Sequence, residues 1–452
     1  MIEKLLRCCS DITRIYVLVR QKKGKDMQQR IQDLLNDSVF DIIRPKLWYL
    51  EKIIVGVAGD CSLNNMGLSD DDMDTLKQQV SIVFHVAATI RFDEKLKQAA
   101  TINIQSTSNI LDLCKEMKHL KSVVHVSTAY ANCFTFDIEE NFYKYSIKPK
   151  DLLHLVNTLP EETINDITSR IINPWPNTYT FTKALAEDLI RTENQHLPIG
   201  IFRPGIVISA AYEPIPGWTD NYNGPTGVIA GAASGILRTL HVDTEKLANL
   251  VPVDLTSNAL IASAWDVSTR IDRRGDDMLI YNFTSIGEAP LSWDIFSKLT
   301  GEFAKEYPSK LATWYFILQT TKYKLLYNIY KFFLHFIPGL LLDFVARMTG
   351  RTPRLQKAYH KIHKMSDVLN HFCMNEWKFR NDNVQKMWSR LNSRDQELFQ
   401  FTTQDFDWTN YFSNYVKGIR VFLFKDDLNT LRKSRTKYKW FFIVHKMLVI
   451  SL

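Results

Sequence analysis

The segment Asn177–Glu187, which reads NTYTFTKALAE, decides how the rest of the chain is interpreted. Its apolar residues have helical spacing, and Tyr179 and Lys183 are four positions apart. Side chains at this spacing share one face of a helix, so the phenol and the ammonium can point into one site. The ammonium is then expected to lower the pKa of the phenol, which favours proton transfer near neutral pH. The alternative is ordinary helix packing, because the same spacing recurs at Tyr327 and Lys331 inside an apolar run.

Short apolar runs on both sides of this segment predict the strands of a buried parallel sheet. They are rich in β-branched residues and alternate with segments of helical pattern. Such alternation predicts an α/β fold with a Rossmann-type doubly wound parallel sheet, whose site lies at the carboxyl ends of the strands. The predicted strands are Ile15–Val19, Ile53–Val57, Ile82–Val86, Ser122–Val126, Gly200–Phe202 and Met278–Phe283.

Small or polar residues follow the first four of these strands. They are Arg20, Asp60, Ala87, Ala88, Ser127 and Thr128. Small side chains such as Ala87 let a flat ligand approach the backbone. In dinucleotide folds, an arginine near the second strand accommodates the 2′-phosphate of NADP, which is the function considered for Arg20. The alternative for Arg20 and the lysines that follow it is a solvated turn.

Other segments carry structural expectations. Residues 134–176 are too long and polar for an ordinary connection, and they predict a helical excursion over a substrate cleft. Residues 100–115 predict a helix with Asn103 in its first turns. The segment Gly217–Gly235 is rich in Gly, Asn and small residues and is interpreted as a loop that lines a channel. Asp254 is interpreted as the N-cap of a later helix.

The composition is typical of a globular protein, with 45% hydrophobic and 23% charged residues among 452. This length predicts two domains, or one domain and an appendage. Residues 1–320 carry 33 basic and 39 acidic side chains, whereas residues 321–452 carry 23 and 10. The basic part is interleaved with apolar runs, which favours a membrane surface over nucleic acid as its partner. The six cysteines lack metal-ligand spacing and are interpreted as reduced thiols facing the cytosol.

Two apolar segments stand out in the last third of the chain. Leu325–Met348 contains the charged residues Lys331 and Asp343 and a Pro-Gly pair at Pro338, so it falls short of an uninterrupted span. It predicts a broken amphipathic hairpin on a bilayer or a lid for an acyl chain, with a buried helical pair as the alternative. Basic residues precede Trp440–Ile450, and this order is typical of an interfacial membrane anchor.

Five strings, in this order along the chain, resemble the extended short-chain dehydrogenases. They are FHVAAT (84–89), HVSTAY (125–130), NTYTFTK (177–183), FRPGIV (202–207) and VPVD (251–254). Longer strings narrow the resemblance to the fatty acyl-CoA reductases: IRFDEKL (90–96), NGPTGVIAG (223–231) and IPG…NEWKFRNDN (337–383). The resemblance extends from residue 1 to about residue 411.

The resemblance implies reduction of long-chain or very-long-chain fatty acyl-CoA to a primary alcohol with NADPH, without a metal. Two hydride transfers would pass through a hemithioacetal and an aldehyde, with release of CoA. It implies a reductase domain over residues 1–300, a helical domain over 301–425 and a membrane-associating tail over 426–452. The active site would face the cytosol at a peroxisomal or endoplasmic reticulum membrane.

The resemblance also implies a role for each site residue. Tyr179 would protonate the carbonyl oxygen, and Lys183 would hold the nicotinamide ribose. Thr128, with Ser127 as the second candidate, would hydrogen-bond the substrate oxygen, and Asn103 would support the lysine through water. The implied cofactor contacts are Asp60 at the adenine, Ala87 and Ala88 along the cofactor, Arg20 at the 2′-phosphate, and Pro204 and Ile206 near the carboxamide.

The chain departs from the family at its start. Dinucleotide folds open with a strand and a Gly-rich turn that binds the pyrophosphate, but no glycine precedes Gly24 here. We therefore expect the first strand to be missing and NADPH to bind weakly to this chain alone. An incomplete reductase gene model and a short, non-catalytic acyl-CoA-binding membrane protein both fit. A third reading, a sugar-nucleotide epimerase, fits the apolar C-terminal segments less well.

Overall fold

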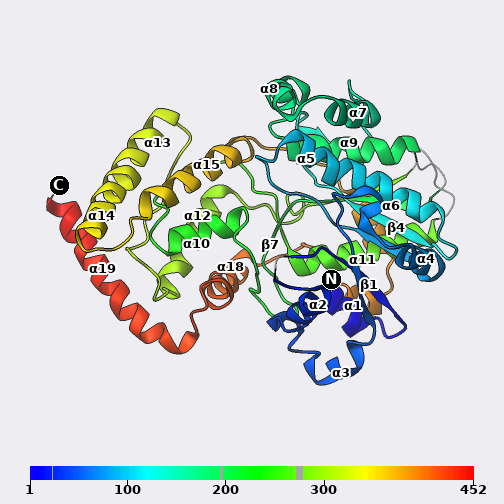
Figure 1. Ribbon diagram of the computed structural model, residues 1–452. Helices are drawn as coiled ribbons and strands as arrows, with labels where there is room; N and C mark the ends of the chain where they lie inside the picture. Colours follow the sequence, from blue (N-terminus) through cyan, green and yellow to red (C-terminus); the bar gives the residue numbers. More distant parts are fainter. Residues whose placement is uncertain (23, 194–196, 271–277, 452) are drawn as a thin grey trace. The chain divides into compact units, whose positions relative to one another are not determined.

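The computed structural model describes residues 1–22, 24–193, 197–270 and 278–451, and Figure 1 shows its ribbon. The chain forms two compact units, each discontinuous in sequence. Unit 1 comprises Met1–Gly205, Asp254–Thr284 and Trp377–Thr402, and unit 2 comprises Ile206–Val253, Ser285–Glu376 and Thr403–Leu452. The domain boundaries at residues 300 and 425 remain a prediction from the sequence.

Unit 1 is built on parallel strands, as the sequence predicted. Four of them form one sheet in the order β10-β6-β4-β3, and β1 and β2 form a second parallel pair. The α/β class and the parallel pairing are confirmed. The strands are β1 (Ile15–Val19), β2 (Ile54–Ala58), β3 (Ile82–His85), β4 (Ser122–Val126), β6 (Ile199–Pro204) and β10 (Leu279–Phe283).

The division into two sheets follows the order of a dinucleotide-binding fold. In that order, 3-2-1-4-5-6, the first strand lies between the second and the fourth. Among the described residues, β1 is paired only with β2, and β3 only with β4. The pair β1–β2 therefore corresponds to strands 2 and 3 of that order. The strands β3, β4 and β6 correspond to strands 4, 5 and 6, and β10 extends the sheet beyond them. Apolar Leu18 of β1 and Ile82 of β3 are 36% and 47% exposed.

Helices cover both faces of the larger sheet. Ile199 and Ile201 of β6 pack into a core with residues of the helices α6 and α9. Gly200 points to the opposite face, since side chains alternate along a strand. A Cβ on Gly200 would lie 2.6 Å from Val267 of α11, so only glycine allows that helix to approach. The site helix α9 is thus fixed on one face of the sheet and α11 on the other.

The helical excursion predicted for residues 134–176 is present. Figure 1 shows its two helices, α7 and α8, near α5 and α9. The predicted helix over 100–115 contains a π-helical turn, Thr101–Gln105, between α5 and α6. The helices of unit 1 are α1 (Ile2–Cys8), α2 (Met27–Leu35), α3 (Leu47–Leu50), α4 (Asp70–Gln79), α5 (Leu96–Ala100), α6 (Ser106–Lys115), α7 (Pro149–Thr158), α8 (Glu161–Ile171), α9 (Thr178–Glu193), α11 (Val253–Thr269), α16 (Asp382–Arg390) and α17 (Ser393–Leu398), and its short strands are β5 (Asp137–Ile138) and β12 (Lys378–Phe379).

Unit 2 is mainly helical, with two small parallel strand pairs, β7–β9 and β8–β11. Its core is apolar and aromatic and includes Trp293, Phe296, Phe412 and Tyr415. The elements of this unit are β7 (Ile206–Ile208), α10 (Pro225–Ala233), β8 (Thr239–His241), β9 (Leu250–Pro252), α12 (Trp293–Glu306), β11 (Gln319–Thr321), α13 (Lys324–Lys331), α14 (Ile337–Met348), α15 (Leu355–Met374), α18 (Trp408–Gly418) and α19 (Leu431–Ser451).

Two sequence expectations are wrong in detail. The segment interpreted as a loop contains α10, because Gly224 adopts a positive φ of 52° and Pro225 then starts the helix at a position where its missing N–H is tolerated. Asp254 lies inside the first turn of α11, which begins at Val253, and is not its N-cap.

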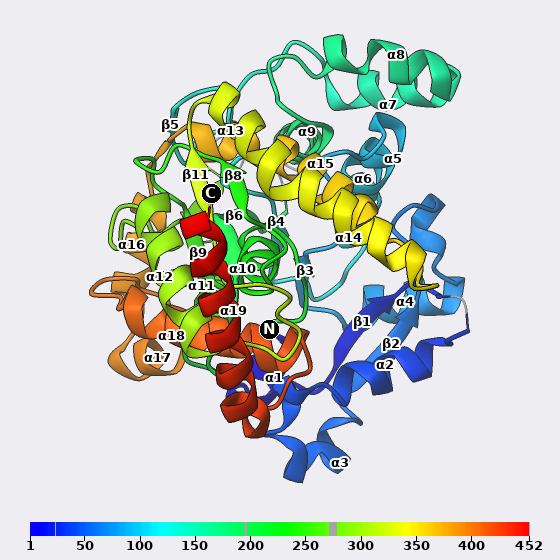
Figure 2. The same cartoon turned by 90° about the vertical axis from the view of Figure 1, so that its left-hand side faces the viewer.

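The apolar segment around Pro338 is one continuous helix, so the expectation of a broken hairpin is wrong. It runs over Lys324–Met348 as α13, a π-helical turn at Phe332–Phe336 and α14, and Figure 2 shows it as one yellow rod. Pro338 lies in the first turn of α14, where the π-helical turn absorbs the change in hydrogen bonding.

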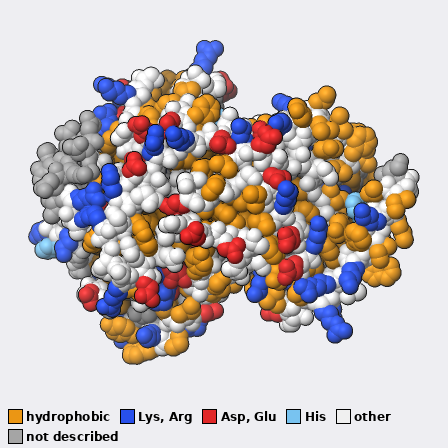
Figure 3. Space-filling view, turned by 180° about the vertical axis from the view of Figure 1, so that it is seen from behind, with side chains coloured by type: hydrophobic (Ala, Val, Ile, Leu, Met, Phe, Trp, Pro, Cys, Tyr) orange, Lys and Arg blue, Asp and Glu red, His pale blue; other side chains and the backbone are white. Residues whose placement is uncertain are grey.

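By length and composition, Lys324–Met348 is long and apolar enough to cross a membrane, and 17% of its most apolar window is buried. Many large apolar side chains on this helix and on α19 are exposed, and orange side chains gather on the corresponding side of Figure 3. Those on the first helix include Leu325, Phe333, Leu341, Phe344 and Met348, and those on α19 include Trp440, Met447, Val449 and Ile450.

Candidate active site

The helix α9 places Lys183 at the carboxyl end of β4. The Oδ1 atom of Asn177 accepts a hydrogen bond from the backbone N–H of Thr180 at 2.9 Å and so caps the start of the helix. Lys183 is 2% exposed, and its Nζ donates to the backbone oxygen of Val126 at 2.7 Å. Burial lowers the pKa of Lys183 to about 8, although the nearby charge of Glu187 acts in the opposite direction.

Tyr179 and Thr128 meet at the same strand end. The Thr128 hydroxyl lies close enough to the Tyr179 phenol to lower its pKa, and the Tyr179 ring stacks on Phe92 with centroids 5.6 Å apart. Burial raises the pKa of Tyr179 to about 12, and the Thr128 hydroxyl only partly opposes it. The lowered tyrosine pKa expected from the sequence is therefore not found, because burial raises the Tyr179 pKa and the Lys183 ammonium is directed to Val126.

Ser127 lies beside this group but does not join it. Its side chain is 3% exposed, and its Oγ has no hydrogen-bond partner among the residues that the structure describes. Its backbone N–H donates to Phe202 at 2.8 Å, which fixes the end of β4 against β6. Of the two hydroxyls that follow β4, the structure brings Thr128 to Tyr179.

Asn103 lies in the π-helical turn and is 1% exposed. Its Oδ1 accepts from the Thr89 N–H at 2.9 Å, and its Nδ2 donates to the Thr182 hydroxyl at 3.0 Å. π-helical turns often occur at functional sites, because the extra residue redirects a side chain. Asn103 thus connects the loop after β3 to the residue that precedes Lys183, and its water-mediated link to the lysine stays a prediction.

The residues predicted for the adenosine end of a cofactor also lie together. Arg20 and Asp60 follow β1 and β2, with Arg20 Nε 3.8 Å from Asp60 Oδ2. The Arg20 side chain is 70% exposed, and Asp60 Oδ1 accepts from the backbone and hydroxyl of Ser62. A Cβ on Gly59 would lie 2.8 Å from the Met66 oxygen, so the backbone is tightly packed here. An accessible guanidinium at a strand end fits a phosphate ligand.

The other predicted cofactor contacts are placed as follows. Ala87 is exposed and Ala88 half-buried in the loop after β3. Pro204 ends β6 in unit 1, whereas Ile206 begins β7 in unit 2. Their contacts with a cofactor remain predictions.

A fully buried ion pair behind the site was missed from the sequence. Arg203 Nε and Nη2 donate to the two carboxylate oxygens of Glu187 at 2.9 and 2.6 Å. Arg203 also donates to the backbone oxygens of Glu139 and Asn141. Both residues stand inside quoted motifs, in NTYTFTKALAE and FRPGIV. Arg203 within the otherwise apolar string FRPGIV was the available signal for a buried charge that needs a partner.

The NEWKFRNDN string also has a structural explanation. The backbone N–H of Asn383 donates to Glu140 Oε2 at 2.6 Å, and its side chain donates to the Ile280 oxygen at 2.9 Å. Trp377 Nε1 donates to the Cys133 oxygen at 3.1 Å. This string therefore fastens a late segment of the chain to the sheet of unit 1.

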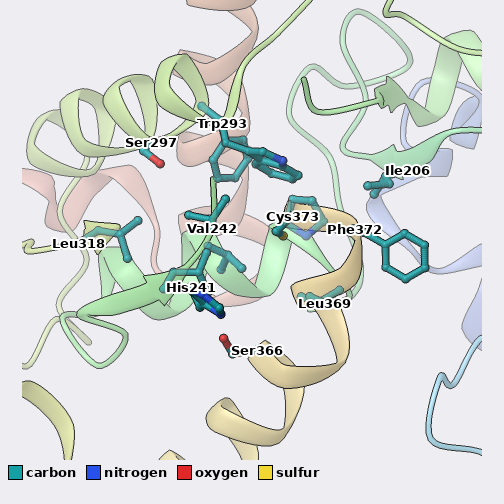
Figure 4. A pocket seen from close by; sticks show the side chains of 14 residues that line it. Ile206, His241, Val242, Trp293, Ser297, Leu318, Ser366, Leu369, Phe372 and Cys373 are labelled. Carbon is teal, nitrogen blue, oxygen red and sulfur yellow. The ribbon is translucent and has the colours of Figure 1, made fainter. Parts of the chain in front are cut away.

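Unit 2 contains an almost entirely apolar pocket, shown in Figure 4. His241 and Ser366 are among its few polar residues, and His241 Nε2 lies 3.1 Å from the backbone oxygen of Lys322. Such a lining suits an apolar ligand. The residues around the pocket are Ile206, Pro225, Val228, Leu240, His241, Val242, Trp293, Phe296, Ser297, Leu318, Ser366, Leu369, Phe372 and Cys373.

Comparison with known proteins agrees with this site. An NAD-binding family model described as male sterility protein matches residues 1–260, and a second model with the same description matches residues 334–426. The fatty acyl-CoA reductase wat of Drosophila melanogaster is 42% identical over 98% of this chain and 85% of its own length. Fatty acyl-CoA reductase 1 of Xenopus laevis is 35% identical over 96% of this chain and 84% of its own.

Solved structures show the same fold at low identity. The terminal R domain of the myxalamid biosynthetic pathway has a TM-score of 0.56 at 18% identity, covering 92% of this chain and 86% of that domain. The reductase domain of a nonribosomal peptide synthetase from Mycobacterium tuberculosis has a TM-score of 0.57 at 15% identity, covering 93% of this chain and 88% of that domain.

The fold and the tyrosine–lysine pair define a nicotinamide-dependent reductase of the extended short-chain dehydrogenase type. Within that class, the two family models and the relatives narrow the assignment, and the chain belongs to the fatty acyl-CoA reductases. Fold and relatives together support reduction of a fatty acyl group with a nicotinamide cofactor.

Proposed function

We propose that this chain reduces long-chain or very-long-chain fatty acyl-CoA to a primary alcohol with NADPH, in two hydride transfers through an aldehyde, with release of CoA. The observation that carries the proposal is the arrangement of Thr128, Tyr179 and Lys183 at the end of β4 in a member of this family. The cofactor, when bound, supplies the hydride.

The chain's own residues would control the oxygen and its proton. The Tyr179 phenol and the Thr128 hydroxyl are neighbours and offer two donors to one carbonyl oxygen. As negative charge develops on that oxygen, Tyr179 would give it a proton. Tyr179 is a weak acid in this buried setting, so the positive charge of Lys183 is needed to stabilise the phenolate that remains.

The choice of NADPH over NADH rests on Arg20. Its side chain is accessible at the end of β1, and the neighbouring carboxylate of Asp60 is engaged by Ser62. A guanidinium can hold a 2′-phosphate with charge-assisted hydrogen bonds. Asp60 is proposed to contact the adenine.

Two features of unit 2 support the proposal of an apolar substrate and of association with a membrane surface. Its pocket is lined by apolar side chains, which suits the hydrocarbon part of an acyl group. The helix Lys324–Met348 and α19 expose large apolar side chains, and basic residues from Arg432 to Lys439 open α19. We propose that these helices associate with a peroxisomal or endoplasmic reticulum membrane, with the active site toward the cytosol.

The test is NADPH oxidation by the purified full chain with acyl-CoA in mild detergent, together with identification of the alcohol. Tyr179→Phe is expected to lower the rate at least about a hundredfold, since it removes the proton donor. Tyr327→Phe is the matched control, because Tyr327 belongs to the second Tyr-x-x-x-Lys string, in unit 2, and is expected to keep full activity. Full turnover by Tyr179→Phe would refute the mechanism. Retention of acyl-CoA without NADPH oxidation by the unaltered chain would favour the non-catalytic binding protein.

A further inference from the structure

Two buried histidines form a pair on the strands β3 and β4, near Lys183. His85 of β3 and His125 of β4 are register partners on neighbouring parallel strands. Their Nδ1 atoms are 3.0 Å apart. Both residues are buried: His85 is 4% exposed and His125 is 1% exposed. The mechanism described above assigns no role to either ring.

The geometry of the pair fixes its protons. A hydrogen bond between two Nδ1 atoms requires a proton on one of them and a lone pair on the other. In a neutral pair, the first ring then has an unprotonated Nε2, and the second ring carries its proton on Nε2. Both Nε2 atoms are buried and have no partner among the described residues. The pair therefore presents one open acceptor and one open donor, and buried polar atoms of this kind commonly bind water.

The pair lies within the electrostatic reach of Lys183. Burial and the charge of Lys183 lower the pKa of His85 to about 3 and hold the pKa of His125 well below its usual range, so both rings are neutral. Lys183 uses one N–H for the backbone oxygen of Val126, which directly follows His125. An ammonium has three N–H donors, so two remain for other acceptors.

We propose that a buried water links the open acceptor of the His85–His125 pair to Lys183, and that the pair thereby sets the orientation and proton affinity of this lysine. This inference rests on the proposed function, because it adds a role in the same reaction. The histidines act through Lys183 and do not touch the substrate, so they are positioning residues. The titratable groups around the lysine are then Glu187 and Tyr179 on its own helix, His85 on β3 and His125 on β4.

Asparagine substitutions separate this role from simple packing. In His125→Asn or His85→Asn, the short amide can still hydrogen-bond the remaining Nδ1, but it provides no atom in place of Nε2. Losing the acceptor disfavours the ammonium, so the pKa of Lys183 is expected to fall by about one unit in the variant that removes it. The basic limb of the kcat profile should move to lower pH by the same amount, with kcat about tenfold lower and KM within about threefold.

The control is the buried histidine pair of unit 2. His335 Nδ1 and His363 Nε2 are 2.9 Å apart, and His335 is fully buried. His335→Asn is expected to change stability to a similar degree and to leave the Lys183 pKa and the kcat profile unchanged. This comparison separates loss of a buried histidine from loss of this particular acceptor.

The decisive measurement is nuclear magnetic resonance of the full chain in detergent, with isotope-labelled histidine and lysine and without substrate. One ring should carry its proton on Nδ1 and the other on Nε2, and the lysine titration should shift in one asparagine variant. Two rings in the same tautomer, or a Lys183 pKa unchanged in both variants, would overturn the inference. The tautomers are read from the unaltered chain, so a variant that fails to fold does not prevent the test. If the chain does not reduce acyl-CoA at all, the proposed function fails while these spectra still decide this inference.

Discussion

Arg203 donates hydrogen bonds to both carboxylate oxygens of Glu187, with donor–acceptor distances of 2.9 and 2.6 Å, and neither side chain is exposed to solvent. Glu187 lies one helical turn after Lys183 and two turns after Tyr179 on α9. Arg203 lies on β6, next to β4, whose carboxyl end carries Thr128. The ion pair therefore fixes the helix that carries two site residues to the strands that carry the third.

Removal of one partner of this pair is expected to be costly. Arg203→Met leaves the Glu187 carboxylate buried without a counter-charge, and Glu187→Leu does the same to Arg203. Each single substitution should reduce the free energy of unfolding of unit 1 by about 3–5 kcal/mol. Urea denaturation of the full chain, followed by tryptophan fluorescence, measures this change.

The double variant is the control for this prediction. Combining Arg203→Met with Glu187→Leu removes both charges, so it should be more stable than either single variant. Arg44, on the surface, pairs with Asp41, and Arg44→Met should change the stability by less than about 1 kcal/mol because that pair is exposed. Equal small losses for Arg203→Met and Arg44→Met would show that the buried pair has no special importance.

Cofactor choice is expected to depend on Arg20. Arg20→Ala should weaken NADPH binding about tenfold or more, because a charge-assisted hydrogen bond to phosphate is lost, and should leave NADH binding nearly unchanged. Protein fluorescence titrated with each nucleotide measures both affinities. Arg14 precedes β1 and donates to the Lys52 oxygen, so Arg14→Ala changes the same strand at its opposite end and serves as the control. Equal losses for NADPH and NADH in Arg20→Ala would argue against a 2′-phosphate role.

The strand framework and the helix that carries Tyr179 and Lys183 were predictable because their signals are local. β1 and β4 begin and end where their apolar runs do, and Tyr179 and Lys183 share a helix face whatever surrounds them. The Tyr179 pKa was mispredicted because burial depends on neighbours that are distant in sequence, such as Phe92. The His85–His125 contact depends on strand register, which one sequence does not specify.

The helices of unit 2 were also predicted only in part from the sequence. Composition identified Lys324–Met348 as apolar, but a Pro-Gly pair looked like a break. The π-helical turn before Pro338 removes that break. It contains buried His335, which accepts a hydrogen bond from the Arg238 N–H at 2.9 Å. Likewise, α10 follows a left-handed Gly224, a backbone conformation that a Gly-rich composition permits but does not specify.

Membrane association is expected to depend on exposed apolar side chains. Leu341 and Phe344 of α14 are 59% and 61% exposed. Replacing both by Asp should reduce co-flotation with anionic phospholipid vesicles severalfold. Each substitution removes an apolar side chain whose transfer from water into the bilayer is favourable, and it adds a negative charge. The same replacement at exposed Trp48 and Tyr49, in unit 1, is the control and should leave flotation unchanged. Full flotation of the α14 variant would exclude this helix from the membrane contact.

Lys183 is expected to reduce stability near neutral pH while it serves the reaction. Burial lowers its pKa to about 8, below the 10.5 of an unburied lysine, so the unfolded chain binds the proton more tightly. Below pH 8 both states are protonated and the folded state carries the full penalty. As pH rises from 8 to 10.5 the folded lysine loses its proton first, and the stability of the unaltered chain rises by up to about 3 kcal/mol.

Lys183→Met removes this pH-dependent loss of stability. The variant should lack activity and yet be more stable than the unaltered chain at pH 7, and the difference should shrink toward pH 10. The lost hydrogen bond to Val126 offsets part of the gain, by about 1–2 kcal/mol. Urea denaturation at a series of pH values measures the difference, with Lys331→Met, at a half-buried lysine of unit 2, as the control. A Lys183→Met variant that is less stable at every pH would show that the buried ammonium is fully compensated by its surroundings.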